Sequence, residues 1–203
     1  MRAPVPPPLK RFIWDIQSMV ELAESEREIL MIGRDLMARL VANDDWLPED
    51  FAIPDETQYQ QYLLYGDGLE RFSVVSTVFH GGQAMPVCQD RVWEIRGLLR
   101  GSMGAQHFLW EPGSAPRPKG DAKLVKSGSV DVVSPKNGEA MQLSNALAES
   151  VSISIHVYGG DIGKILRHAL DADGTAHAFI PGYANPVASP AYDIWSIQTE
   201  ICD

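Results

Sequence analysis

The sequence is poor in cysteine, in positive charge and in long apolar runs. Of its 203 residues only Cys88 and Cys202 are cysteines, too few for a disulfide framework, which fits a reducing cytoplasm. No stretch approaches about 18 uninterrupted apolar residues, so we expect no transmembrane helix. The proline-rich N-terminus has no apolar segment of signal-peptide length either. We therefore expect a cytoplasmic protein that does not bind membranes.

The charge balance argues against further classes of partner. Lys and Arg number 17 and Asp and Glu 27, which gives a formal net charge of −10 at pH 7. A protein that binds nucleic acid needs a basic face, and here the basic residues are scattered along the chain. An anionic membrane would repel the same surface. The partner we expect is a small molecule, and the chain could be a monomer or a homo-oligomer.

Apolar and charged residues make up 45% and 22% of the chain, the proportions of a folded domain. In residues 9–24 the apolar positions recur at helical spacing. Ser25 and Glu28 have the spacing of a capping box, which begins a second predicted helix that ends near Asn43. A third helix is predicted over residues 55–65, where tyrosines and a leucine keep the same spacing.

From residue 71 onward the sequence is typical of β-structure, with β-branched and aromatic runs separated by Gly, Pro and Asn. Strands are predicted over residues 72–79, 92–99, 105–110, 124–125, 129–133, 150–158 and 176–180. Such frequent short strands predict a mostly β sandwich or barrel. The chain then divides into a proline tail with a helical cap, residues 1–68, and a barrel, residues 69–203, within one structural domain.

Two stretches of the sequence resemble the paired motifs of cupins. The first has the cupin spacing at Gly82, Cys88, Asp90, Glu94 and Gly101. In the second, which runs from Gly138 to Asn145, Met141 stands at the position of a metal-binding histidine. Cys88 and Asp90 stand at the two histidine positions of the first motif. The pair of spacings within a strand-rich region is a stronger signal than either spacing alone.

Further segments narrow the resemblance to the thiol dioxygenases, that is, cysteine dioxygenase and its relative 3-mercaptopropionate dioxygenase. The matching segments are residues 59–64, 71–76, 82–83, 86–87, 92–93, 153–159 and 182–185. The resemblance implies a cupin jelly-roll, or double-stranded β-helix, with an N-terminal helical cap. It also implies the addition of both atoms of O₂ to a thiol at a non-haem Fe(II), which three neutral histidines hold.

The same resemblance assigns roles to five residues. Ser154, His156 and Tyr158 match the catalytic Ser-His-Tyr relay of the family, and alternate positions on a strand face one side. Arg167 matches the arginine that pairs with the substrate carboxylate, a role suited to a bidentate guanidinium. Gln61 matches the glutamine of the substrate pocket.

The metal positions depart from the family, because Cys88, Asp90 and Met141 replace its three histidines. A thiolate, a carboxylate and a thioether prefer different metals from a set of imidazoles. Glu94 lies where ordinary cupins keep a metal-binding glutamate, so a Zn or other divalent site of Cys88, Asp90 and Glu94 is one interpretation. The other is structural: Met141 and Cys88 pack in the interior, and the two carboxylates are solvated or pair with Arg91 or Arg96.

Two functions follow from this pattern. The first is a thiol-dioxygenase-like pseudoenzyme, which binds a small carboxylate or thiol acid and holds either no metal or another divalent ion. The second is an active thiol dioxygenase, or another cupin oxygenase, with a divergent metal site. Polar pocket residues without the family's metal ligands favour the first, because unused buried polar groups cost stability.

Overall fold

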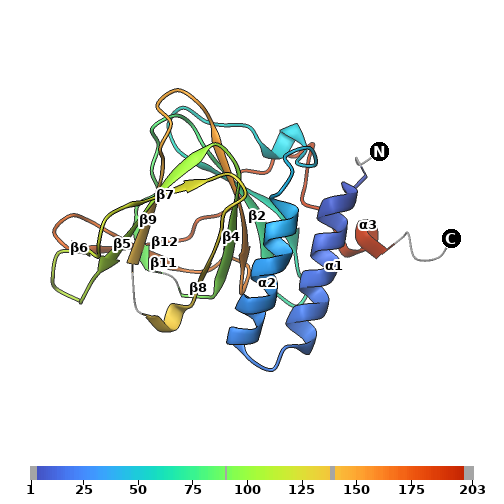
Figure 1. Ribbon diagram of the computed structural model, residues 1–203, viewed down its shortest axis with the longest axis horizontal. Helices are drawn as coiled ribbons and strands as arrows, with labels where there is room; N and C mark the ends of the chain where they lie inside the picture. The colour runs from blue at the N-terminus through green and yellow to red at the C-terminus, as the bar shows by residue number, and fades with distance from the viewer. Residues whose placement is uncertain (1–3, 90, 138–139, 199–203) are drawn as a thin grey trace.

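The computed structural model describes residues 4–89, 91–137 and 140–198, and shows two antiparallel sheets with helices packed on one side (Figure 1). The helices are α1 (Pro7–Leu22), α2 (Glu26–Leu40) and α3 (Ile194–Gln198), with 3-10 turns η1 (Glu49–Phe51) and η2 (Pro135–Asn137). The strands are β1 (Gln60–Gly66), β2 (Ser73–Phe79), β3 (Val87–Gln89), β4 (Glu94–Arg100), β5 (Ser102–Leu109), β6 (Arg117–Pro118), β7 (Lys123–Lys126), β8 (Val130–Val133), β9 (Ala140–Asn145), β10 (Ser152–Tyr158), β11 (Arg167–Leu170) and β12 (Ala176–Phe179). The mostly β jelly-roll with an N-terminal helical cap is confirmed.

The strands form two sheets whose neighbours are mostly distant in the sequence. The helix-side sheet has the order β1-β2-β10-β4-β8, and the second sheet has the order β12-β11-β3-β9-β5-β6, with β7 paired to β5. β10 lies between β2 and β4, and it pairs with β2 along its whole length and with β4 from Ile153 to Tyr158. Because β10 is the central strand of its sheet, its side chains project into the middle of the molecule on both faces.

One face of the helix-side sheet packs against α1 and α2, as Figure 1 shows. Leu9 and Ile13 of α1 share an apolar cluster with Ile95 and Ile155 of the sheet, and all four are fully buried. Gly33 lets α2 come close to the sheet, since a Cβ there would lie 2.2 Å from the Ile95 side chain. This layer is held by apolar burial, which contributes about 25 cal/mol per Å².

The other face of the helix-side sheet points into the barrel and carries polar side chains. Successive strand residues alternate between faces, so the neighbours of the apolar cluster face inward. Thr77, Glu94, Arg96, Ser154 and His156 lie on this inner face and are buried. The interior of the barrel is therefore the place where chemistry can occur.

The helical predictions are confirmed for the first two helices and wrong for the third. The capping box forms, since the Ser25 hydroxyl accepts a hydrogen bond of 3.2 Å from the Glu28 backbone N–H. Residues 60–66 instead form β1, which pairs with β2. Tyr62 packs toward the helices and Gln61 toward the interior, so both faces are buried and no alternation of apolar and polar residues marks the strand.

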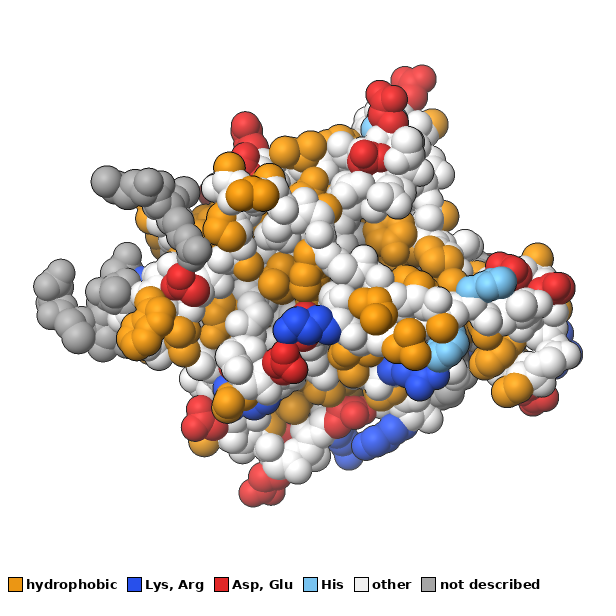
Figure 2. Space-filling view, turned by 180° about the vertical axis from the view of Figure 1, so that it is seen from behind, with side chains coloured by type: hydrophobic (Ala, Val, Ile, Leu, Met, Phe, Trp, Pro, Cys, Tyr) orange, Lys and Arg blue, Asp and Glu red, His pale blue; other side chains and the backbone are white. Residues whose placement is uncertain are grey.

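The surface mixes charges of both signs. On the face seen in Figure 2, acidic, basic and apolar side chains are interspersed. Within the described residues, no helix combines the length and the apolar composition needed to cross a membrane.

Candidate functional site in the barrel interior

The predicted Ser-His-Tyr residues lie together on the inward face of β10. The Ser154 hydroxyl is 2.7 Å from His156 Nε2, and the Tyr158 hydroxyl is 3.2 Å from His156 Nδ1. The His156 and Tyr158 rings stack with centroids 5.5 Å apart. All three side chains are buried, so water does not compete for these hydrogen bonds.

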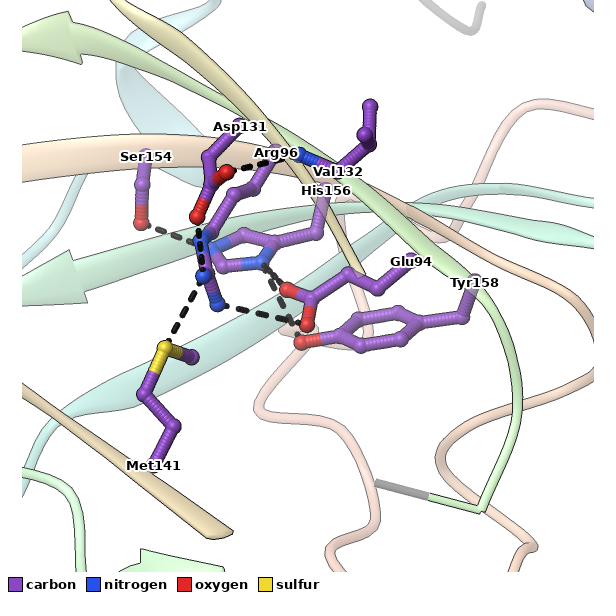
Figure 3. Close-up of polar contacts among 8 residues, drawn as sticks. All are labelled: Glu94, Arg96, Asp131, Val132, Met141, Ser154, His156 and Tyr158. Atoms are coloured by element: carbon purple, nitrogen blue, oxygen red, sulfur yellow. Dashed lines mark hydrogen bonds and ion pairs between the residues drawn. The ribbon is translucent and has the colours of Figure 1, made fainter. Parts of the chain in front are cut away.

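Glu94 joins this group from the neighbouring strand β4. Its Oε1 lies 2.6 Å from His156 Nδ1, closer than the Tyr158 hydroxyl (Figure 3). Burial alone would raise the pKa of Glu94, but the charge of Arg96, the hydrogen bond from His156 and the charge of Arg167 together lower that pKa below its usual value. Glu94 is therefore an ionised carboxylate, and it accepts a hydrogen bond from the N–H group at Nδ1 of His156.

Arg96 connects the two sheets across the interior. Its guanidinium donates from Nη2 to Asp131 at 2.6 Å and to the Met141 sulfur at 2.9 Å, while Nη1 lies 3.5 Å from Glu94 Oε2 (Figure 3). Only 6% of Arg96 is exposed, and Glu94 is just as buried. A buried charge is stable only when it is paired and hydrogen-bonded, and each of these two ions supplies the charge that the other needs.

Two of the three metal positions of the thiol-dioxygenase pattern lie side by side. Cys88 on β3 and Met141 on β9 are direct cross-strand partners, and both line the same interior cavity. Asp90 lies outside the described residues.

These positions do not fit an Fe(II) ion held by three histidines. A thiol and a thioether stand in for imidazoles, and a permanently charged guanidinium contacts the Met141 sulfur. A guanidinium offers no lone pair and repels a divalent cation. Within the described part of the chain, no three His, Cys, Asp or Glu side chains are grouped as metal ligands.

Arg167, the predicted carboxylate partner, lies in the wall of the same cavity. It projects from β11 and is only 4% exposed. Its positive charge helps to lower the pKa of Glu94. Burial raises the pKa of Tyr59, and the charge of Arg167 partly opposes that rise. Arg167 is therefore close enough to Glu94 and Tyr59 to act electrostatically on a molecule in the cavity.

Gln61, the other predicted substrate-binding residue, is not among the residues that line this cavity. Its amide nitrogen donates a hydrogen bond of 3.3 Å to the carbonyl of Gly182. Its Oε1 is buried and has no hydrogen-bond partner among the described residues. Gln61 is the cross-strand partner of Thr77, which in turn pairs with Ser154. Gln61, Thr77 and Ser154 are therefore neighbours across three strands of the helix-side sheet. Arg167 instead lies on the second sheet, as Cys88 and Met141 do.

Two small cavities flank Arg96. The first, about 10 Å³, is lined by Met85, Cys88, Glu94, Arg96, Met141, Leu143, Tyr158 and Arg167. The second, about 40 Å³, is lined by Arg96, Gly97, Leu98, Met103, Ala105, Val125, Ser129, Asp131, Leu143 and Ser154. One water molecule needs about 10–15 Å³, so the first cavity has room for a single water and the second for about three.

Arg96 and Asp131 are the parts of this network that sequence reasoning did not bring forward as site residues. The sequence suggested Arg96 only as an ion-pair partner for a carboxylate, and the structure shows that ion pair with Glu94. The available signal was the Glu-x-Arg spacing on a predicted strand, because residues two apart on a strand share a face. Nothing in the sequence linked Asp131 to either, since the pairing of β4 with β8 comes from the fold.

No family model matches the chain. Several solved structures are similar to it in fold. An uncharacterized conserved protein with a double-stranded β-helix domain from Klebsiella pneumoniae is 13% identical, with a TM-score of 0.43 over 64% of this chain and 91% of that one. The Cnp3 cupin domain of Schizosaccharomyces pombe is 14% identical, with a TM-score of 0.41 over 54% and 69%. KdgF from Halomonas sp. is 15% identical, with a TM-score of 0.41 over 57% and 93%.

Proposed function

We propose that this chain is a thiol-dioxygenase-like protein that binds a small carboxylic acid or thiol acid in its barrel without an iron ion. The observation that carries the proposal is the contact of the Arg96 guanidinium with Met141, 2.9 Å from its sulfur. Arg96 brings a permanent positive charge to the position that the resemblance assigns to iron. An anion can then bind to the protein's own cations.

Arg167 supports the choice of a carboxylate as the ligand. Two guanidinium groups, Arg96 and Arg167, line one buried cavity, and Glu94 is the only carboxylate among its described lining residues. A planar guanidinium binds a carboxylate through two parallel hydrogen bonds, and such charge-assisted bonds are strongest away from water. A small acid would therefore gain affinity and orientation from Arg167.

The size of the cavity defines what must move on binding. A cavity of about 10 Å³ has no room for an acid of three carbons. Met85 and Met141 lie in its wall. Methionine side chains are unbranched and adopt many shapes, so these two can make room at low cost.

Calorimetric titration with 3-mercaptopropionate and with propionate tests this function. We expect R167A to bind both acids at least tenfold more weakly, the equivalent of about 1.5–3 kcal/mol for a lost charge-assisted contact. Exposed Arg117 on β6 offers a matched control, and R117A should bind as the unaltered protein does. Equal affinity of R167A and R117A would contradict the carboxylate site.

Metal analysis distinguishes the alternative function. Protein produced with iron supplied should contain well below one equivalent of iron per chain. Stoichiometric iron, together with O₂ uptake on adding 3-mercaptopropionate or cysteine, would instead establish an active dioxygenase with a divergent metal site.

A further inference from the structure

Three side chains of the network have the arrangement of a nucleophile, a base and an orienting acid. We propose that Ser154, His156 and Glu94 form a charge-relay triad, in which Ser154 attacks a short acyl ester held in the neighbouring cavity. Ser154 Oγ lies 2.7 Å from His156 Nε2, and Glu94 Oε1 lies 2.6 Å from His156 Nδ1. Such a triad is defined by these contacts and roles and occurs on unrelated folds.

The proton positions follow from the charges around Glu94. The ionised Glu94 can only accept a hydrogen bond, so Nδ1 of His156 carries a proton and donates a hydrogen bond to Oε1. In the neutral imidazole, the form that acts as a base, the other ring nitrogen Nε2 holds a lone pair and accepts a hydrogen bond from the Ser154 hydroxyl 2.7 Å away. A hydroxyl bonded to an imidazole lone pair is the activated form of a serine nucleophile.

Two neighbouring hydroxyls on the same sheet lack this arrangement. Ser152 donates to the Ser102 carbonyl and to Asn145. Thr77, the cross-strand partner of Ser154, is equally buried, and its hydroxyl has no hydrogen-bond partner among the described residues. Of these three hydroxyls, the one on Ser154 is bonded to His156, which makes Thr77 a matched control for it.

The cavity beside Ser154 selects the substrate. Its volume of about 40 Å³ corresponds to about three water molecules, the size of an acetyl group. Leu98, Met103 and Leu143 in its wall suit a methyl group, and Arg96 in the same wall supplies a positive charge that favours a developing oxyanion. The side chain of Asp131, also in the wall, is 53% exposed, so the cavity lies close to solvent.

The reaction is hydrolysis in two steps. Ser154 Oγ forms a bond to the acyl carbon while its proton passes to His156 Nε2. The bond from carbon to the leaving oxygen then breaks, and the departing alcohol or phenol takes that proton. A water molecule then gives a proton to His156 Nε2 and attacks the acyl carbon. The bond from that carbon to Ser154 Oγ breaks, and Oγ takes the proton back from His156, which releases acetic acid and restores Ser154. Ester and water become acid and alcohol, with no oxidant or metal. The proposal does not depend on the carboxylate site at Arg167.

The test is acylation by p-nitrophenyl acetate, followed by release of p-nitrophenol and by peptide mass spectrometry. We expect one acetyl group on Ser154 in the unaltered protein and in T77V. S154A should lose this acetyl group and the early release of p-nitrophenol. Absence of an acetyl group on residue 154 of the unaltered protein, or equal release by S154A, would overturn the triad.

Two further variants keep the proposal testable if S154A does not fold. S154C retains a nucleophile, and it should be acetylated at the same position. E94Q leaves Ser154 and His156 in place but removes the charge that orients the imidazole, so kcat should fall by about two orders of magnitude or more with KM little changed. An unchanged kcat in folded E94Q, or a thiol in S154C that stays unmodified, would count against the role of Glu94 or of residue 154.

Discussion

The two faces of β10 show how one strand can have two different roles. Ile153, Ile155 and Val157 face the helices, whereas Ser154, His156 and Tyr158 alternate with them and face the barrel interior. All six are buried to a similar degree. Burial therefore does not distinguish the two faces. The difference is that the apolar face needs only close packing, and the polar face needs a partner for every donor and acceptor.

This difference sets how each face responds to change. On the helix side, free energy is spread over many weak contacts, and each deletion costs in proportion to the volume lost. In the interior, Glu94 and Arg96 depend on one another, because either ion without the other would be an uncompensated charge away from water. The interior thus concentrates its stability in few groups.

The largest expected effect comes from removing the interior cation. R96A leaves the fully buried Glu94 without the charge that stabilises it, and we expect a loss of about 3–5 kcal/mol in the free energy of unfolding. Urea unfolding followed by circular dichroism measures this. The double variant E94Q/R96M removes both charges and should recover most of the loss. A loss in R96A below about 1 kcal/mol would mean that the pair is not coupled as described.

A second, somewhat smaller effect separates the two faces directly. I155A deletes a fully buried side chain from the helix-side face and should cost about 2–5 kcal/mol in unfolding free energy. S154A, one residue away on the opposite face, removes one neutral hydrogen bond and should cost about 0.5–1.5 kcal/mol. If the two variants lose the same stability, the contrast between the faces is wrong.

Much of the fold could be predicted because local signals and burial agreed. The β-branched run 73–79 and the capping box at Ser25 are local features, and both formed as predicted. β3, β9 and β11 were not predicted, since β3 and β11 are only three and four residues long and β3 and β9 are defined by pairing with distant partners. The predicted helix over 55–65 failed for the related reason that a strand buried on both faces loses its alternating pattern.

For the candidate site, the sequence could place residues on one strand but not across strands. Ser154, His156 and Tyr158 were expected to share a face, which follows from strand periodicity alone. The approach of Arg96 to Met141 depends on the second sheet folding over the first, and nothing in either local sequence specifies it. The expectation for Gln61 rested on the resemblance, and in the fold it lies in the row of Ser154 and Thr77.

The last expected effect concerns the pH dependence of stability. In the unfolded chain the pKa of Glu94 has the ordinary value of 4.5, and folding lowers this pKa to about 2, because the Arg96 charge and the His156 hydrogen bond outweigh the effect of burial. A group of this kind stabilises the fold fully above the unfolded pKa, and the contribution is lost as the pH falls from 4.5 through the folded pKa of about 2. Unfolding free energies of the unaltered protein should therefore decrease more steeply with acidification than those of E94Q/R96M. Both proteins carry the same remaining carboxylates, so the difference between their curves reports on Glu94 and its ion pair. Parallel curves would show that Glu94 is not held as a buried anion, and the orientation of His156 would then need another cause.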